Sequence, residues 1–523
     1  MRVKILFNIA FFLFATNNIH AQLNIQAANF TVQTGAVVNV QGNLTSSNDL
    51  PGFGKFLLNG SSAQNVNMNG HSIPNLEINN SSGINLTGNA RISNSLLFTN
   101  GKIIAGYYNL SLADIATTTG MGTGNFVETN GPGQVIKEIT SNLNALEIPV
   151  GAGTVYRPAF LTTSGSNSGA KVGVQVLGTV SVNSPSMASD YINTNWTITE
   201  TGINGSLNTS AKYLTSDISG TESNLKPYLF NGTDWSSTVG TINTATNTIS
   251  FPISIASANI TAMDKFDLLK SKMFLQGAYN SSTHLMIDNL RTGGLIPTSD
   301  PYSTSTYNGA FARVNDAVTE TIDPSILNDQ PLQGNNIVDW VFLELRNGHT
   351  VLQTRSALVQ RDGDIVDVDG KSPVTFNNVN NGNYTIAVRH RNHLGLSTDP
   401  STFTPALSEA QSSATLVDFT ASSTSLYGGS TAHGVASDGN YVLWGGNANL
   451  DGKVNYINPN NDKDYILSNI LGGLATGRVS GYSIGDLNMD GVVRYTNPTN
   501  DKDFLLSTIL AGTATKTLTQ YLP

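Results

Sequence analysis

Residues 76–112 read LEINNSSGINLTGNARISNSLLFTNGKIIAGYYNLSL, and this stretch decides the fold of the N-terminal part of the chain. Apolar and polar residues alternate in pieces of three to five, and turns rich in Asn and Gly separate the pieces. Alternation with a period of two in such short pieces predicts β-strands. The same pattern extends from Leu23 to about Pro149, for example at Val37-Val38-Asn39-Val40 and Phe56-Leu57-Leu58.

Strands this short and this closely spaced are typical of stacked rungs, because one rung is too small to bury its own apolar face. We therefore predict a right-handed β-helix for residues 22–150. No exact repeat period can be read from the sequence, so a β-sandwich is the alternative architecture for this region.

The composition predicts a mainly β, multidomain protein and excludes several functions. Charged residues make up only 12% of the 523 residues, and the net charge of −9 offers no basic surface to a phosphate backbone. Nucleic acid is therefore not an expected partner. The chain has no Cys, which excludes disulfides, thiolate nucleophiles and Cys-ligated zinc.

Met1 to Ala21 has the three parts of a secretory signal peptide. Arg2 and Lys4 give a basic start, residues 5–15 are apolar, and Ala21 is a small residue at a plausible cleavage point. The apolar run is shorter than the ~20 residues that a spanning helix needs. We expect a signal peptide over 1–21, no transmembrane segment after its removal, and a secreted or cell-surface protein.

Two further β regions follow the predicted β-helix. In 151–270 the strands are longer and predict a β-sandwich, with Trp196 and Trp235 as anchors of its core. A sugar-stacking platform is the alternative role for these two rings. Residues 271–440 resemble a fibronectin-like or transthyretin-like β-sandwich, with a strong strand at 338–345 and a tight turn at Asn381-Gly382.

Two polar clusters in this third region allow more than one interpretation. The segment RDGDIVDVDG at 361–370 either binds calcium or forms two Asp-Gly turns. Its aspartates are Asp362, Asp364, Asp367 and Asp369. His390 and His393 would lie on opposite faces of a single strand, so we expect polar residues at a strand end rather than a shared metal site.

The strongest motif occurs twice near the C-terminal end, with an offset of 39 residues (486 − 447). Residues 447–452 read NANLDG, and residues 486–491 read DLNMDG. Oxygen-bearing side chains at positions 1, 3 and 5, followed by Gly at position 6, form the opening of an EF-hand calcium loop. We therefore predict a module at 441–523 with two calcium-binding loops, in which the metal helps to fold the module.

The twelfth position of an ordinary EF-hand loop carries the closing ligand, but here it holds Asn458 in the first copy and Asn497 in the second. We therefore expect a six-residue insertion before the closing ligand of each loop. An exit helix capped by Asn461 would place Asp464 three residues after the cap, and Asn500 would place Asp503 likewise. Asp462 and Asp501 are the alternatives. Position 7 contributes a backbone carbonyl. The predicted ligands are Asn447, Asn449, Asp451, Lys453, Asp464, Asp486, Asn488, Asp490, Val492 and Asp503.

The duplicated loops resemble dockerin modules over about residues 446–512, although the insertions NPNNDKD and NPTNDKD depart from the dockerins of cellulosomes. This resemblance implies two Ca²⁺ ions and a cohesin-like partner. The stretch from about Leu275, which includes Asp339-Trp340 and residues 389–393, resembles the C-terminal region of secreted surface proteins of Bacteroidetes labelled haemagglutinin-like or adhesin-like. That resemblance implies the surface of a Gram-negative bacterium.

We therefore expect a non-catalytic role in adhesion or surface assembly, with a protein or a glycan at the cell surface as the partner. No nucleophile elbow, P-loop, H-E-x-x-H or dinucleotide fingerprint occurs in the sequence. The alternative is a polysaccharide-degrading enzyme, or its scaffold component, because dockerin-like modules accompany such enzymes. A glycoside hydrolase would need two carboxyl groups about 5–10 Å apart across a groove.

Overall fold

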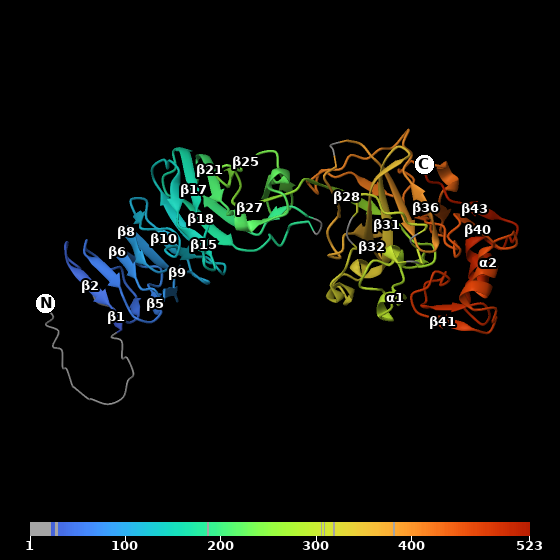
Figure 1. Cartoon of the computed structure of the whole chain (residues 1–523), viewed down its shortest axis with the longest axis horizontal. Helices are drawn as coiled ribbons and strands as arrows, with labels where there is room; N and C mark the ends of the chain where they lie inside the picture. Colours follow the sequence, from blue (N-terminus) through green and yellow to red (C-terminus); the bar gives the residue numbers. More distant parts are fainter. Residues whose placement is uncertain are drawn as a thin grey trace, which may run out of the picture.

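The computed structural model describes residues 22–26, 30–185, 188–304, 306–307, 309–316, 319–379 and 382–523. The predicted signal peptide and Asn381 of the predicted turn lie outside the described residues. The described part is mainly β and contains several sheets, as predicted. Figure 1 shows two halves that follow one another along the long axis. No helix of the described residues is long and apolar enough to cross a membrane.

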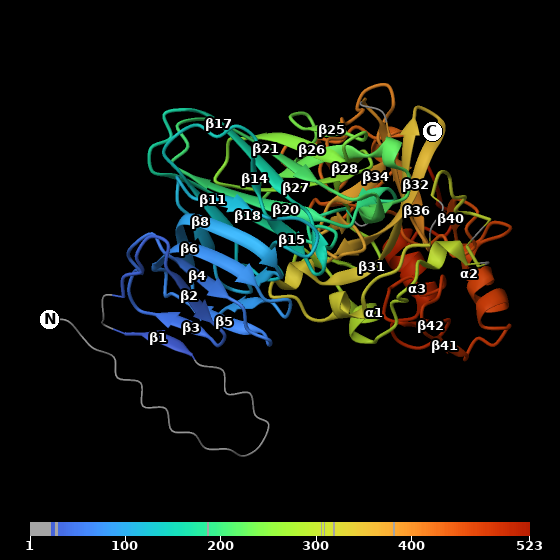
Figure 2. The same ribbon diagram turned by 60° about the vertical axis from the view of Figure 1, so that its left-hand side comes forward.

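The N-terminal region is a β-solenoid built from two sheets whose strands alternate along the chain and pair in parallel, except for the antiparallel β15–β16 pair at the end of the first sheet. One sheet contains, in spatial order, β1 (Leu23–Ile25), β3 (Leu44–Ser46), β5 (Gln64–Asn67), β7 (Ile84–Leu86), β9 (Ile103–Ile104), β12 (Val127–Glu128), β15 (Val150–Ala152) and β16 (Val155–Tyr156). The other begins with β2 (Val37–Val40), β4 (Lys55–Leu58), β6 (Ser72–Asn79), β8 (Ala90–Asn100), β10 (Leu110–Leu112) and β13 (Val135–Ile139), and β11 (Thr117–Thr119) pairs with β8. Figure 2 shows β2, β4, β6 and β8 stacked as successive rungs. The solenoid prediction is confirmed.

Alternation along each short strand produces this architecture. In β7 and β10 the two outer residues are buried and the middle residue is half-buried. Burial of one such aliphatic side chain contributes about 1.5–3 kcal/mol. Gly101 is required at one turn, because it has a φ of +101° and a Cβ there would lie 1.9 Å from the Asn80 carbonyl oxygen.

The solenoid continues directly into a β-sandwich, because β13 pairs antiparallel with β18 in the same sheet. That sheet adds β18 (Ala170–Leu177), β19 (Tyr191–Ile192), β20 (Asn195–Thr201), β22 (Ile218–Ser219), β23 (Lys226–Phe230), β24 (Trp235–Ser236) and β27 (Ser257–Met263). A second sheet contains β14 (Leu146–Ile148), β17 (Ala159–Gly165), β21 (Gly205–Lys212), β26 (Thr248–Ile253) and β25 (Thr241–Asn243). Trp196 is fully buried, as predicted for a core anchor. One hydrophobic cluster runs from Ile25 to Ala262, so the solenoid and this sandwich share a core.

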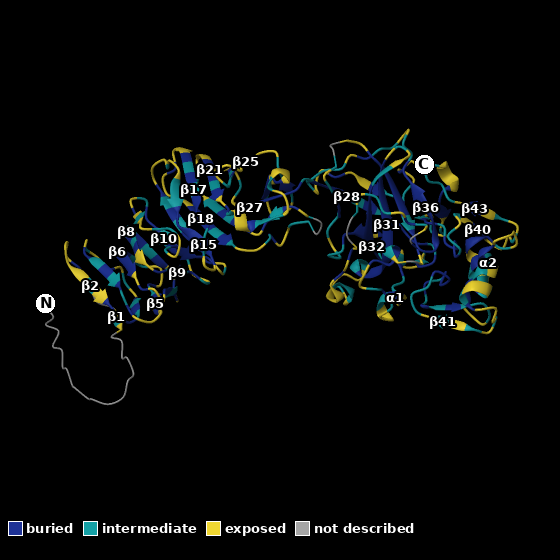
Figure 3. Ribbon diagram, in the orientation of Figure 1, coloured by how far each residue is buried: buried dark blue, intermediate teal, exposed yellow. Residues whose placement is uncertain are grey.

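The C-terminal half is built on one large sheet. Its strands are β34 (Val374–Asn377), β28 (Phe266–Lys272), β33 (Asp364–Val366), β32 (Thr350–Gln360), β31 (Ile337–Asn347), β35 (Thr385–His390) and β36 (His393–Ser397), with β37 (Leu416–Asp418) paired to β28. The predicted strand 338–345 lies within β31 and is buried along its whole length. Figure 3 shows β31, β32 and β36 as the buried centre of this half.

Short elements surround this sheet and connect the larger ones. The paired strands are β29 (Tyr279–Asn280) with β30 (Leu285–Met286), and β38 (Gly434–Val435) with β39 (Tyr441–Val442). The helical turns are η1 (Thr215–Asp217), η2 (Glu222–Asn224), α1 (Asn289–Thr292), η3 (Pro301–Ser303), η4 (Pro324–Leu327), η5 (Gln333–Asn335) and η6 (Gly429–Thr431).

The duplicated segment folds as two similar copies with exchanged strands. The first copy contains β40 (Lys453–Asn455), α2 (Asp462–Tyr465), the π-helix η7 (Ile466–Ile470) and β41 (Arg478–Ser480). The second contains β42 (Val492–Arg494), α3 (Asp501–Phe504), the π-helix η8 (Leu505–Ile509) and β43 (Thr517–Thr519). β40 pairs with β43 and β41 pairs with β42. Val454 and Val493 lie in a small shared core, which also includes Leu394 from β36.

Candidate functional site

In both duplicated loops, side-chain oxygens of the loop accept hydrogen bonds from the backbone amides of the same loop. In the first loop Asn449 accepts from the Asp451 amide (3.1 Å), and Asp451 accepts from the Lys453 amide (2.8 Å). The second loop repeats both bonds at the equivalent positions, at 3.1 and 2.9 Å. Its first residue, Asp486, also accepts from the amides of positions 5 and 6, at 3.0 and 2.9 Å. The loop openings therefore have the same curled conformation in both copies.

The predicted exit helices begin where the sequence indicated. The Asn461 side chain accepts from the Asp464 amide at 2.8 Å, and Asn500 accepts from the Asp503 amide at 2.8 Å. Both asparagines are therefore N-caps, as predicted. The two helices continue through η7 and η8, so each loop leads into two turns of helix.

Asp462 and Asp501 are fully buried within the loops, whereas the side chains of Asp464 and Asp503 are largely exposed. Each buried carboxylate bridges the two arms of its own loop: Asp462 accepts from the amides of Ala448 (2.8 Å) and Asn455 (2.9 Å). Asp501 makes the two equivalent bonds, at 2.7 and 2.8 Å. The side chains of Asp464 and Asp503 are 56% and 61% exposed and pair with the neighbouring lysines.

The two bridging carboxyl groups are fully buried without a balancing positive charge from the described part of the chain. Burial, with Asp451 nearby, raises the pKa of Asp462 to about 7. Burial, with Asp486 and Asp490 nearby, raises the pKa of Asp501 to about 8. No basic side chain of the described residues forms an ion pair with either carboxylate. Buried carboxylates in such a setting are stabilised by protonation or by a bound cation.

The first loop also contains buried oxygens that have no partner. Asn447 Oδ1, at position 1, and Asn455 Oδ1, at position 9, accept no hydrogen bond. An orphaned buried acceptor costs about 1–3 kcal/mol. In the second copy Arg494 replaces Asn455, and its guanidinium pairs with Asp490. The two loops therefore differ in how their oxygens are satisfied.

The predicted ligands are brought together only in part. Asn449, Asp451 and Asp464 line one hollow of about 710 Å³, and the three equivalent residues of the second copy line another of the same volume. Lys453 and Val492, at position 7, are the first residues of β40 and β42. Within the described residues no group of three or more His, Cys, Asp or Glu side chains is placed to hold a metal. The loops instead combine amide oxygens with a few carboxylates.

Asn392 holds both loops at their first residues, and no sequence motif indicated it. Its backbone oxygen accepts from the amides of Gly446 (2.9 Å) and Asn447 (3.1 Å). Its side-chain amide donates to the Asp486 carbonyl at 2.7 Å. Asn392 is fully buried in the turn between β35 and β36. The large sheet therefore fixes the position of one loop relative to the other.

His390 and His393 flank this turn, at the end of β35 and the start of β36, as expected for strand-end residues. They lie on two strands rather than one, so their Nδ1 atoms approach to 2.9 Å. His390 Nε2 lies 3.0 Å from the Asp339 carboxylate. Burial lowers the pKa of both histidines, with Asp339 opposing the shift at His390.

The four aspartates of 361–370 do not share a centre. Asp367 pairs with Arg355 at 2.7 Å and accepts from the amides of Val368 (2.7 Å) and Thr375 (3.2 Å). Asp362 and Asp369 close local turns, because Asp362 accepts from the Asp364 amide at 3.2 Å and Asp369 accepts from the Ser372 amide at 2.9 Å. The Asp364 side chain instead pairs with Lys272 at 3.3 Å. Local turns and ion pairs therefore account for this acidic segment.

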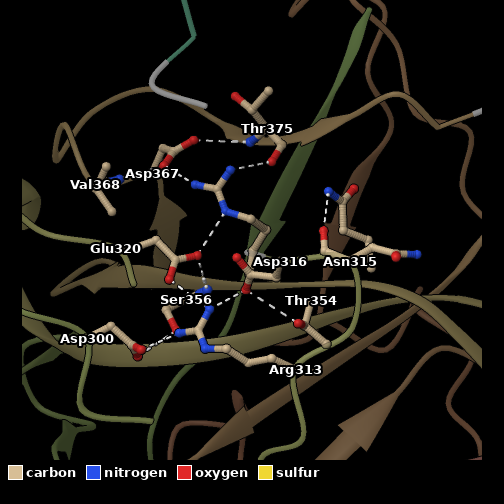
Figure 4. Close-up of polar contacts among 12 residues, drawn as sticks. Asp300, Arg313, Asn315, Asp316, Glu320, Thr354, Ser356, Asp367, Val368 and Thr375 are labelled. Carbon is tan, nitrogen blue, oxygen red and sulfur yellow. Dashed lines mark hydrogen bonds and ion pairs between the residues drawn. The ribbon is translucent and has the colours of Figure 1, made fainter. Parts of the chain in front are cut away.

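Asp367 belongs to a buried ion network that crosses the sheet (Figure 4). Arg313 pairs with Asp300 and Asp316, and it lies 2.9 Å from Glu320. Arg355 connects Glu320 (3.2 Å) to Asp367. Burial raises the pKa of Asp316 and of Glu320. Each of these carboxylates is at most 2% exposed, so the network lies in the interior and pairs acids with arginines.

Comparisons with known proteins do not assign a family. No protein-family model, no curated protein and no solved structure matches this chain. The resemblance to dockerin modules and to surface adhesins therefore stays a prediction, and a functional role has to be argued from the loops themselves.

Proposed function

We propose that this chain is a calcium-binding protein of the cell exterior, whose two C-terminal loops each bind one Ca²⁺ ion. The observation that carries the proposal is the pair of buried carboxylates, Asp462 and Asp501, which face the loops without a basic partner. A divalent cation would balance this charge. Calcium is the best candidate because it accepts mixed carboxylate, amide and carbonyl oxygens in flexible loops.

We assign the closing ligand of each loop to Asp462 and Asp501 rather than to Asp464 and Asp503. The side chains at positions 1, 3 and 5 and the carbonyl at position 7 would complete each set. Two features support a fit to the metal: the orphaned oxygen of Asn447, and the raised pKa of both closing carboxylates. The largely exposed Asp464 and Asp503 already have lysine partners.

The role that fits this architecture best is adhesion or assembly at the surface of a Gram-negative bacterium. A predicted signal peptide and a solenoid joined to β-sandwich regions suit a protein that projects from a cell. Extracellular calcium modules bind at roughly 10⁻⁴–10⁻³ M, which is sufficient outside the cell. The partner would be a protein, such as a cohesin-like one, or a glycan.

Calorimetric titration of residues 22–523 with CaCl₂ tests the metal sites. We expect two bound ions in the wild type, and none after combined Asp451→Ala and Asp490→Ala substitution. Combined Asp462→Asn and Asp501→Asn substitution should weaken both sites at least tenfold. The matched control, Asp464→Ala with Asp503→Ala, should keep both. Loss of binding in the control alone would reverse the ligand assignment, and no uptake by the wild type would refute the calcium role.

Protein and glycan arrays probed with the same chain, in CaCl₂ and in EGTA, test the adhesive role. We expect the chain to be retained by at least one protein or glycan of the arrays in CaCl₂. If the chain retains nothing on either array while it binds calcium normally, adhesion is wrong and the metal has only a structural role.

A further inference from the structure

A cavity of about 330 Å³ lies at the junction of the two halves, and a second of about 300 Å³ adjoins it. The two cavities share Val182, Asn183, Phe230 and Gly232 in their walls. Residues from both halves line the larger cavity, including Trp235 from the first half and Asp369 from the second. Neither cavity includes a residue of the calcium loops.

The junction that forms the larger cavity is held by paired hydrogen bonds. Glu409 accepts from the Ser237 amide (2.8 Å) and from the Ser237 hydroxyl (2.7 Å). Asp234 accepts from the amide (2.9 Å) and the hydroxyl (2.6 Å) of Ser412. These four bonds fasten the β23–β24 hairpin to the second half, so the two walls face each other at a fixed separation.

One wall of the larger cavity is aromatic. The rings of Phe230 and Trp235 have centroids 5.0 Å apart, and Phe266 completes this side. The Trp235 indole donates from Nε1 to the Asn183 carbonyl at 2.8 Å, which fixes the orientation of its ring. Flat apolar faces of this kind pack against flat apolar faces of a ligand.

The opposite wall is polar but offers little free charge. Asp367 is neutralised by Arg355, and Asp369 accepts from the Ser372 amide (2.9 Å) and hydroxyl (2.6 Å). Thr375 and Gln411 also line this side. In the adjoining cavity Asn259 donates to Asn195 at 2.7 Å, while its own Oδ1 is buried and accepts nothing. The polar groups are thus hydroxyls and amides together with Asp369 and Lys371, which carry opposite charges.

We propose that these adjoining cavities bind a short segment of a neutral glycan. A sugar ring has an apolar C–H face that would lie on Trp235 or Phe230, and hydroxyl groups that would reach the amides and hydroxyls opposite. Of the charged side chains in this wall, Asp367 is paired with Arg355, and Asp369 and Lys371 carry opposite charges, so the wall offers no net charge that would favour an ionic glycan. Clefts of about 300 Å³ or more that combine aromatic walls with a few polar groups are typical small-ligand sites. The inference gives a partner class to the proposed adhesive role and rests on that role for its biological meaning.

Titration of residues 22–523 with neutral oligosaccharides, followed by tryptophan fluorescence and ligand-observed NMR, tests this inference. The probes are cellotriose, maltotriose, mannotriose, xylotriose and chitotriose, with trigalacturonate as the anionic comparison. Ser184→Trp and Gln411→Trp each place a bulky ring at the cavity wall from a different segment. Ser423→Trp, at an exposed serine outside both cavities, is the matched control.

We expect saturable binding of at least one neutral probe, a loss of at least tenfold in both wall variants, and no change in the control. Binding that survives both wall variants, or no saturable binding of any neutral probe, would overturn the inference, as would tighter binding of trigalacturonate. The same titrations in EGTA separate the two proposals. Sugar binding without calcium uptake would refute only the metal role, and calcium uptake without sugar binding would refute only the glycan site.

Discussion

Replacing Asp501 by Asn should stabilise the calcium-free protein at neutral pH and destabilise the calcium-bound protein. The carboxylate is fully buried, and burial with Asp486 and Asp490 nearby raises its pKa to about 8. Without a cation, the folded protein must therefore protonate this group or retain a buried charge. With calcium, the same charge becomes a ligand, and its loss removes binding energy.

The magnitude follows from the shift in pKa. A carboxyl whose folded pKa lies above its unfolded value of 3.8 contributes fully to stability below about pH 3.8. That contribution is lost as the pH rises towards 8. At pH 7.5 the loss is about 5 kcal/mol at 1.36 kcal/mol per pH unit, as an upper figure. Asparagine avoids this loss, but it turns an N–H₂ group towards a backbone amide, which costs about 1–3 kcal/mol. A net gain of at most about 2–4 kcal/mol is expected.

Urea unfolding and hydrogen exchange of residues 22–523 at pH 4.0 and pH 7.5, in EGTA or CaCl₂, measure this effect. In EGTA the wild type should lose stability between the two pH values, and Asp501→Asn should lose much less. In CaCl₂ the order of the two proteins at pH 7.5 should reverse. Asp503→Asn is the control, because that side chain is exposed. The reasoning is refuted if Asp501→Asn is destabilising by the same amount with and without calcium.

Three further substitutions test separate parts of the structure. Asn392→Ala should weaken calcium binding at the second loop more than at the first, because the lost side chain bonds the Asp486 carbonyl of the second loop and otherwise His393; equal weakening in a two-site titration would contradict this. Arg494→Asn frees Asp490 from its ion pair and should tighten the second site several-fold, whereas an unchanged affinity would show that the pair does not compete with the metal. Burial raises the pKa of Asp267 to about 6, so its contribution to stability is lost as the pH rises through 6. Asp267→Asn should therefore gain at most about 3 kcal/mol at pH 7.5, reduced by the loss of its ion pair with Lys265, and nothing at pH 3.5 in urea unfolding.

The sequence was most informative where short segments determine the structure. The alternation in Ile84-Asn85-Leu86 predicts the buried and exposed faces of β7, because the side-chain period of a strand is two. The caps at Asn461 and Asn500 are equally local, since each bond reaches only three residues along the chain. A duplication at a fixed offset strengthened both predictions for the loops.

The remaining features of the loops depend on contacts between residues that are distant in the sequence. Asn392 lies 94 residues from the loop residue that it binds, and no pattern near it marks it as a clamp. Asp462 and Asp464 lie two positions apart in one helical turn, so they point to different sides of the helix. Spacing along the chain cannot predict which of the two side chains becomes buried. Packing of the helix against the first loop decides which of the two is buried, because it covers Asp462 completely.

The duplicated loops are joined to the large sheet rather than carried on a separate linker. The Leu443 amide donates to the Phe274 carbonyl at 2.7 Å, and Gly445 pairs with His393 just before the first loop. Arg391, beside the Asn392 clamp, donates to the Ser483 carbonyl and lies over the Tyr482 ring, 4.6 Å from its centre. A ligand that orders either loop should therefore also stabilise the end of the sheet. A docking module that moves freely would make few contacts with the rest of the chain. The contacts described here instead favour a rigid unit that presents the whole chain in one orientation.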